Sequence, residues 1–438
     1  LAQQFLHGYV SAGDGGTTLA INADDEFYMQ SDGSFDAQTT AIFRDIGWYH
    51  IVFGMDAANT TCSIEVNGVP QILTGTLPSH TDYAINNNTL QAIGRYSGGG
   101  SPTNYLDGYQ AETVFIDGTL YTATDFGEFD STGLYWTPKS SDEIKALTFG
   151  TNGFYLDNTT NAETDASGEG NNWTNNNTVT LSTHTPTNLY NTFNPLWNDK
   201  SMPAGTITTG NRRLIPVGSS DQERVISTLG VSSGKWFFGG SRPTSISASN
   251  EQEIGIANNK VANFTGTYPT GTWAVNDSSG SYFRVNENGA GAVQITTSGP
   301  TMDAWWCAFD VDAGKGWVGT SSGGGSITYL PATNGGTVGD PADGSNPTFT
   351  FTANDTYWPE AWVSRSGSYF YGEFGDGDFS VTPPTNYIAI STTNIAAETT
   401  RTASDTTKYF DTILYEGNGD GQRVGQFQPF GNAFTVAK

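Results

Sequence analysis

The sequence predicts an all-β protein: two antiparallel β-sandwich (jelly-roll) domains joined by an irregular connector. Short apolar runs with period-two alternation recur along the 438 residues and are separated by turns rich in Gly, Asn and Ser. Aromatic residues make up 13% of the chain and charged residues only 14%, so the chain has the material to build cores. No long stretch shows the periodicity of a helix, which leaves sheets as the main structure.

The first domain is expected over residues 1–139. Residues 48–55 alternate, with Tyr49, Ile51 and Phe53 on one face, and residues 61–66 alternate again before Asn67-Gly68. Asn-Gly supplies the two positive φ values of a type I′ turn, so a hairpin is expected at this point. Further strands are expected over residues 90–95 and 109–116.

The rest of the chain divides into three parts. Residues 140–201 are expected to form a surface connector without a core of its own, apart from one helical turn over 141–147. Residues 202–400 predict a second β-sandwich, whose longest apolar run, 304–309, is typical of a buried strand. A Gly, Ser and Pro-rich stretch over 319–349 predicts a long loop, and residues 401–438 predict an extended C-terminal segment.

The charge balance restricts the partners. Eighteen Lys and Arg residues against 44 Asp and Glu residues give a net charge of −26, which repels nucleic-acid phosphates and anionic lipids. No apolar run approaches the roughly 18 residues that a membrane span needs. We therefore expect no nucleic acid, no membrane insertion, and a saline extracellular setting in which salt screens the self-repulsion.

The order of motifs in the first domain resembles the laminin-G/concanavalin-like jelly rolls, especially those of marine tailed-phage structural proteins. The motifs are residues 48–69, 90–94, 105–112 with its Asp107-Gly108-Tyr109, 125–128, and the closing Trp136-Thr137-Pro138-Lys139. The opening strands usual in this family do not appear before Leu1. The resemblance therefore implies a virion protein, of which we expect this chain to be a segment.

The second domain resembles a SPRY domain in the order of residues 234–238, 253–257, 305–315, 357–361, 372–375 and 383–387. The family usually has an acidic residue after its first Trp strand and an Asn before the Phe-Gly. Here Gly239 and Glu373 stand at those places, so the core hydrogen bonding is expected to differ while the fold holds. The connector and a strand-like run at 410–419 also resemble the phage proteins, and we expect the tail to pack on a neighbour or to lead into further residues.

Two catalytic patterns are incomplete in this sequence. Gly319-Thr320-Ser321-Ser322-Gly323 matches the serine nucleophile-elbow pattern, but it runs into further glycines where that motif needs a helix. No alternating Glu-x-Asp-x-Glu run, typical of concanavalin-like glycanases, is present, although carboxylates from separate strands remain an alternative. We therefore expect no enzyme activity. Cys62 and Cys307 are expected to be buried free thiols rather than a disulfide.

Four aromatic residues at loop edges are candidate glycan-binding or receptor-binding residues: Tyr96, Tyr105, Tyr268 and Trp273. Aromatic rings stack on the apolar faces of sugars, while neighbouring amides bond the hydroxyls. The alternative is that each ring closes one end of its own core.

Calcium is the one cofactor that the sequence suggests. Its oxygen ligands are sought in acidic turns, and the densest turns here hold Asp24 and Asp25, and Asn418 and Asp420. The alternative is that these are solvated acidic turns, which are common in a chain of this charge.

Together these observations predict a non-enzymatic component of the virion surface, in a tail, fibre or head appendage. Its expected partners are other virion proteins, copies of itself and a host surface glycan or receptor. The alternative is a secreted carbohydrate-active enzyme or a bacterial adhesin with lectin-like modules.

Overall fold

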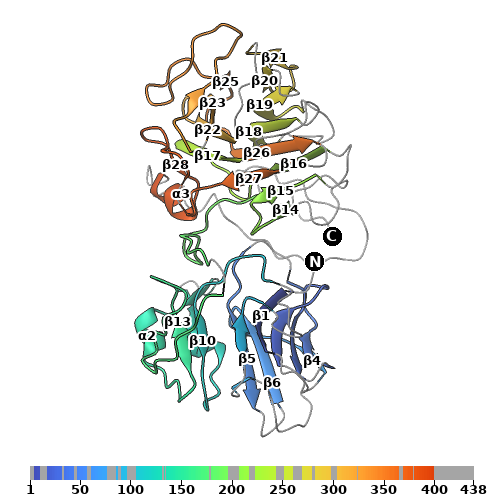
Figure 1. Cartoon of the computed structure of the whole chain (residues 1–438), viewed down its shortest axis with the longest axis vertical. Coiled ribbons are helices and arrows are strands. Elements are labelled where there is room, and N and C mark those ends of the chain that lie inside the picture. Colours follow the sequence, from blue (N-terminus) through green and yellow to red (C-terminus); the bar gives the residue numbers. More distant parts are fainter. Residues whose placement is uncertain are drawn as a thin grey trace.

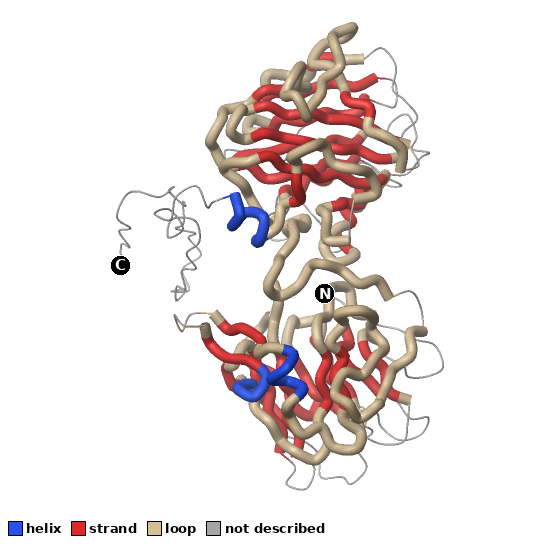
Figure 2. The backbone as a smooth tube through the Cα atoms, turned by 90° about the vertical axis from the view of Figure 1, so that its left-hand side faces the viewer, coloured by secondary structure: helices blue, strands red, loops and turns tan. Residues whose placement is uncertain are grey.

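A computed structural model shows two β-rich units, one above the other along the long axis of the molecule (Figures 1 and 2). The lower unit holds the N-terminal part of the chain, and the upper unit holds the green-to-red C-terminal part in Figure 1. The structure describes residues 4–9, 17–31, 34–43, 47–56, 61–75, 85–86, 90–95, 105–130, 133, 135–176, 179–195, 207–216, 222–242, 251–259, 269–278, 282–296, 303–322, 324–364, 368–377 and 379–398.

The first unit is a sandwich of antiparallel sheets. One layer has six strands in the order β8 (Leu73–Gly75), β4 (Ser34–Thr39), β3 (Phe27–Ser31), β2 (Thr18–Ile21), β1 (Gln4–Tyr9) and β9 (Gln91–Ile93). The facing layer has β5 (Ile51–Asp56), β6 (Thr61–Val66) and β7 (Val69–Pro70). Phe27 and Met29 of the first layer pack against Ile64, Val66 and Phe53 of the second.

The Asn67-Gly68 hairpin is confirmed. Both residues have positive φ, 49° and 76°, and β6 pairs antiparallel with β7 across them. A second, smaller hairpin packs over this region and consists of β11 (Gly127–Phe129) and β12 (Trp136–Pro138), preceded by the single-turn helix α1 (Ala123–Phe126). The indole ring of Trp136 lies against Gly68, because a Cβ added there would fall 2.2 Å from the ring.

The connector is not the coreless linker that the sequence predicts. Its strand β13 (Phe154–Leu156) pairs antiparallel with β10 (Thr113–Phe115) of the first unit. Its predicted helical turn is present as α2 (Ser141–Lys145), capped by Ser140. Ile144, Phe149 and Tyr155 are buried together, so residues 141–156 belong to the first unit.

The second unit is also an antiparallel sandwich, with one short parallel pairing between β17 and β28. Its nine-stranded sheet follows the order β14 (Ile207–Thr208), β15 (Arg213–Leu214), β27 (Phe370–Glu373), β17 (Lys235–Ser241), β22 (Ala304–Asp310), β23 (Lys315–Ser321) and β24 (Thr328–Tyr329), with β25 (Phe349–Thr350) on β23 and β28 (Ile388–Ala389) on β17. The six-stranded sheet is β16 (Gln222–Ile226), β26 (Tyr357–Ser364), β18 (Gln252–Asn258), β19 (Thr272–Ser278), β20 (Tyr282–Glu287) and β21 (Val293–Gln294).

The core of the second unit explains its long apolar runs. Trp305 and Cys307 of β22 point into the main core between the sheets, whereas Trp306 points to the opposite face and packs with Phe237 and Trp317. A strand that is buried on both faces needs no alternation of polar and apolar residues. The predicted buried strand at 304–309 is confirmed.

Cys62 and Cys307 do not form a disulfide, as expected. Cys307 is buried as expected, but Cys62 is only half-buried. The described helices are short, the longest being α3 (Thr392–Glu398) with seven residues. No helix among the described residues is long and apolar enough to cross a membrane.

Candidate functional site

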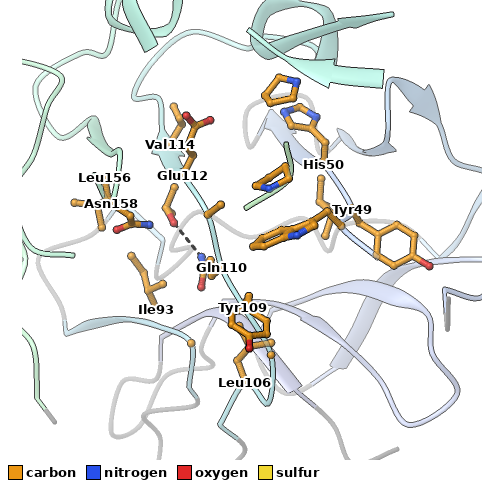
Figure 3. Close-up of a pocket in the computed structure, with 18 of the residues that line it drawn as sticks. Tyr49, His50, Ile93, Leu106, Tyr109, Gln110, Glu112, Val114, Leu156 and Asn158 are labelled. Carbon is orange, nitrogen blue, oxygen red and sulfur yellow. Dashed lines mark hydrogen bonds between the residues drawn. The ribbon is translucent and has the colours of Figure 1, made fainter. Parts of the chain in front are cut away.

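A wide cleft runs through the first unit and reaches the boundary with the second. Its volume is 3530 Å³, several times the roughly 300–1,000 Å³ of a small-molecule pocket. Figure 3 shows Leu106 and Tyr109 at one end and Glu112 and Val114 toward the other. A cleft of this size suits a polymer or a chain segment better than a small cofactor.

The floor and the walls of the cleft differ in kind. Leu19 and Ile21 of β2 form the floor; they are half-buried, whereas Phe27 and Met29 of β3 are covered by β5 and β6. By contrast, every residue of 51–55 and every residue of 109–116 lines the cleft. Successive side chains of a strand point to opposite faces, so an unbroken run means that the edge of the strand borders the cleft.

At the end near the second unit, three aromatic rings lie together. His184 of the connector stacks on Tyr109, with ring centroids 4.5 Å apart and an interplanar angle of 22°. Trp48 also packs against His184, with ring centroids 5.7 Å apart. The His184 Nδ1 accepts a hydrogen bond from the Tyr190 amide, and burial lowers the pKa of His184, so the imidazole is neutral at pH 7.

A buried ion pair continues this group into the second unit. Asp376 is 3% exposed, and both of its carboxylate oxygens accept hydrogen bonds from Arg212, at 2.9 and 2.8 Å. The Tyr109 hydroxyl donates to the same carboxylate at 2.9 Å. Burial alone would lower the pKa of Arg212, but Asp376, Tyr109 and Tyr371 together outweigh it and raise that pKa.

Further bonds hold the two units together at this point. The Asp107 carboxylate accepts from the backbone amides of Thr209 and Gly210, and the Asp376 carbonyl accepts from Ser182 and Thr183. We use the name joint for the set Trp48, Asp107, Tyr109, His184, Arg212 and Asp376. Through these hydrogen bonds and ring contacts the joint links the first unit, the connector and the second unit.

Glu112 is the most unusual ionisable residue on the cleft wall. Its backbone has a φ of +45°, a conformation that costs energy for a residue with a side chain. The Glu112 side chain is exposed at the cleft wall, yet partial desolvation there raises its pKa. The charge of Asp157 adds to this effect, although a hydrogen bond from Tyr155 opposes it. That bond joins the Tyr155 hydroxyl to Glu112 Oε1 at 2.9 Å.

The four predicted glycan-binding residues have different environments in the structure. Tyr105 lines the cleft and is 52% exposed, as a stacking residue requires. Trp273 is in β19, 5% exposed, and packs edge-on against Tyr357 at 5.5 Å. The ring of Trp273 is covered by core residues and cannot stack on a sugar, so the predicted sugar contact is wrong for Trp273. Tyr96 and Tyr268 lie outside the described residues.

The first of the two predicted calcium turns is held by hydrogen bonds from its own backbone to Asn22. Asp24 is exposed and Asp25 is 7% exposed, and the side chain of Asn22 braces their turn by accepting from the amides of Asp24 and Glu26. Within the described part of the chain, no three His, Cys, Asp or Glu side chains are grouped to hold a metal ion. Asn418 and Asp420 lie outside the described residues.

The serine motif does not form a nucleophile elbow. Ser321 ends strand β23 and is 5% exposed. Its hydroxyl accepts a hydrogen bond from the Trp306 indole at 2.9 Å, and a turn follows where the motif needs a helix. Ser321 therefore has a structural role in the core.

A buried charged group lies in the six-stranded sheet of the second unit. Arg224 Nη1 donates to Glu253 Oε1 and to Glu360 Oε2, each at 2.6 Å, and all three side chains are fully buried. Burial raises the pKa of Glu360 well above its usual value, and the charge of Glu253 adds to the effect although Arg224 opposes it. Burial therefore favours the protonated form of Glu360.

Sequence reasoning does not identify Arg212, Glu112 or Asp376 as functional residues. Asp376 follows Phe374-Gly375 in an acidic stretch, and nothing near it indicates a partner 164 positions away. Glu112 follows the Asp-Gly-Tyr motif, which was a usable signal, since that motif marks the cleft wall.

No protein-family model and no curated protein match this chain. The SPRY domain of human HERC1 is similar at 12% identity, over 41% of this chain and 95% of that chain, with a TM-score of 0.29. The PSpry domain of TRIM65 shows 11% identity over 42% of this chain and 92% of that chain, with a TM-score of 0.30. The stonustoxin structure shows 11% identity over 42% of this chain and 28% of that chain, with a TM-score of 0.29. Identities and scores this low assign neither a family nor a function.

Proposed function

We propose that this chain is a non-enzymatic component of the surface of a tailed-phage virion, which contributes to assembly and attaches to a glycan or receptor on the host. The motif order of the first domain and the connector supports the virion origin. The observation that carries the attachment role is the open cleft with the exposed ring of Tyr105 in its lining. Its partners are other virion proteins and further copies of itself.

The lining of the cleft fits a saccharide. The ring of Tyr105 offers an apolar face, and the side chains of Trp173, Asn175 and Asn176 line the same cleft. Rings stack on the apolar faces of sugars, and amides both donate to and accept from hydroxyls. The joint holds Tyr109 and the neighbouring wall in place, so the rings are positioned before a ligand binds.

The experiment compares Tyr105→Ala with Tyr135→Ala. Tyr135 is 50% exposed but does not line the cleft, which makes it a matched control. We expect Tyr105→Ala to weaken binding of host polysaccharide about tenfold, the effect of losing about 1.4 kcal/mol of ring contact. Equal binding by both variants would contradict the glycan site. Mass spectrometry of purified particles tests the virion origin, which fails if the polypeptide is absent from them.

A second candidate function is favoured by Glu112. A carboxyl with a raised pKa is suited to protonate a glycosidic oxygen, and Asp157 is close enough for its charge to act on Glu112. With Asp157 as the second carboxylate, the cleft of a secreted carbohydrate-active enzyme would result. An adhesin would use the same cleft without cleavage.

Release of reducing ends from host polysaccharide distinguishes the candidates. The enzyme requires that Glu112→Gln abolishes the release while Glu128→Gln, which alters an exposed carboxylate outside the cleft, leaves it unchanged. No release by the unaltered chain supports the non-enzymatic function.

A further inference from the structure

One edge of strand β5 has no partner strand among the described residues and borders the cleft. Among the described strands β5 pairs only with β6. The His50 carbonyl accepts a hydrogen bond from the Asn67 amide. In the antiparallel register of β5 and β6, His50 and Asn67 are therefore a hydrogen-bonded pair. Since such pairs alternate along the strand, the N–H and C=O groups of Ile51, Phe53 and Met55 point away from β6. They therefore border the cleft.

The opposite wall repeats this arrangement. Among the described strands β10 pairs only with β13, with Val114 opposite Tyr155. The Tyr155 amide donates to Asp165 and its carbonyl accepts from Ala166, so both groups point away from β10. Val114 and Tyr155 are then a non-hydrogen-bonded pair, and the N–H and C=O of Val114 also face the cleft.

Two such edges on either side of an apolar floor form a slot for one more strand. The residues at these edges that turn their N–H and C=O groups to the cleft are half-buried. These groups gain partners when an extended segment lies between the two edges and bonds on both of its sides. We propose that residues 408–416 of this chain, which lie outside the described residues, enter the cleft and add a strand between β5 and β10. This inference concerns how the first unit is completed and goes beyond the proposed function.

The described chain ends close to the cleft. The first residue of α3, Thr392, donates from its amide to the Leu189 carbonyl, and Thr393 donates to the side chain of Asn188. Leu189 and Asn188 both line the cleft, so α3 begins at its rim. Figure 1 shows α3 on the side of the upper unit that faces the lower one. Nine further residues, 399–407, can span about 30 Å when extended, which brings 408–416 within reach.

The sequence of the segment matches the slot. Residues 408–416 read Lys-Tyr-Phe-Asp-Thr-Ile-Leu-Tyr-Glu and are followed by Gly417-Asn418-Gly419, a turn signal that ends a strand. In an extended segment Phe410, Thr412 and Leu414 would share one face, which would lie on the half-buried floor of Leu19 and Ile21. Aromatic and β-branched residues are those that strands favour.

The slot and the glycan contact occupy different ends of the cleft. Tyr105 lies two residues before Asp107, which bonds the second unit, whereas the slot lies along β5 and β10. A strand there would cover the wall that carries Glu112, so this inference and the second candidate function exclude each other.

Residue-resolved hydrogen exchange on the full chain tests the inference, with a matched pair of proline variants. Thr412→Pro removes a ladder donor from the segment, and Thr402→Pro places the same change before it. We expect the amides of Phe53 and Val114 to be protected in the full chain. Thr412→Pro should accelerate their exchange about tenfold or more, and Thr402→Pro should leave it unchanged. The amide of Val52, which is bonded to β6, reports that the sandwich stays folded.

Three results would overturn the inference. The first is unprotected exchange of Phe53 and Val114 in the full chain. The second is protection that Thr412→Pro does not reduce, which would mean that another segment fills the slot. The third is protection that disappears on dilution, which would assign the slot to a second copy of the chain. The glycan assay with Tyr105→Ala is independent of all three, so the two proposals fail separately.

Discussion

Gly239 and Glu373 face each other across the pairing of β17 with β27. The ring of Trp306 occupies the space beside Gly239, because a Cβ there would fall 2.2 Å from the ring. Trp306 stacks on Phe237 with centroids 5.5 Å apart. The Glu373 carboxylate accepts from the amide and the hydroxyl of Ser380. The missing side chain at 239 thus makes room for a tryptophan.

Gly239→Ala should therefore destabilise the second unit. The added methyl group would also lie 2.4 Å from the Trp305 carbonyl oxygen, so ring and strand must shift, at a cost of about 1–3 kcal/mol. Denaturant unfolding measures this. Gly377→Ala is the control, because a Cβ there meets nothing within 4 Å. Equal stability of the two variants would contradict the packing described here.

Gly68→Ala tests the contact between the first hairpin and Trp136. Gly68 and Gly94 have nearly the same φ, 76° and 73°, so alanine is strained similarly at both. Only at Gly68 does the added Cβ meet the indole, at 2.2 Å. We expect Gly68→Ala to cost about 1–3 kcal/mol more than Gly94→Ala. Thermal or urea unfolding of the two variants gives the difference, and none is expected if Trp136 can move aside freely.

Asp376→Asn should loosen the joint between the units. It leaves the Arg212 guanidinium without its counter-charge, which costs about 3 kcal/mol, the low end for a broken buried pair because Arg212 is 23% exposed. Limited proteolysis of the connector and the unfolding midpoint measure the change. Tyr109→Phe removes only the hydroxyl that donates to Asp376 and should cost about 1 kcal/mol. A larger effect of Tyr109→Phe would mean that the ion pair contributes little.

Glu360 makes stability depend on pH. Below its usual pKa of 4.5 the carboxyl is protonated in both states, so it has no effect. Above that pKa the unfolded chain releases the proton while the folded protein, whose pKa is raised, keeps it. Stability therefore falls as pH rises from about 4.5 to the folded pKa, with a slope of up to about 1.4 kcal/mol per pH unit.

Glu360→Gln retains the shape of the protonated group and removes its titration. We expect this variant to lack that part of the pH dependence and to exceed the unaltered protein in stability at pH 7. Urea midpoints of the two proteins between pH 4 and pH 8 provide the comparison. Parallel curves would show that Glu360 is ionised in the folded state.

The sandwich architecture was predictable because its signals are local. Asn67-Gly68 defines a turn by its own backbone preferences, and the unbroken apolar run at 304–309 indicates a strand that is covered on both faces. The pairing of β13 with β10 has no such signal, since Phe154–Leu156 is a three-residue run within a polar region and its partner lies far back in the chain. Periodicity shows that a strand exists but not where it pairs.

The candidate site is harder to predict from the sequence, because its residues come together from distant segments. Tyr105 could be singled out because it stands beside a Gly-rich loop, but Trp273 has a similar setting and lies in the core. The joint joins residues from three distant segments, with Tyr109 and Asp376 separated by 267 positions. Charge composition alone does not distinguish a buried carboxylate from the many solvated ones in a chain of this acidity.

The way the connector is shared between the units determines where the molecule can be divided for separate study. A fragment that stops at residue 139 would lose β13 and Phe149, and would expose the apolar side of β10 to solvent. Phe193, in turn, belongs to the core of the second unit. Fragments should therefore be cut within 179–181, where Val179 and Leu181 are exposed, so that each half keeps the residues that fill its interior.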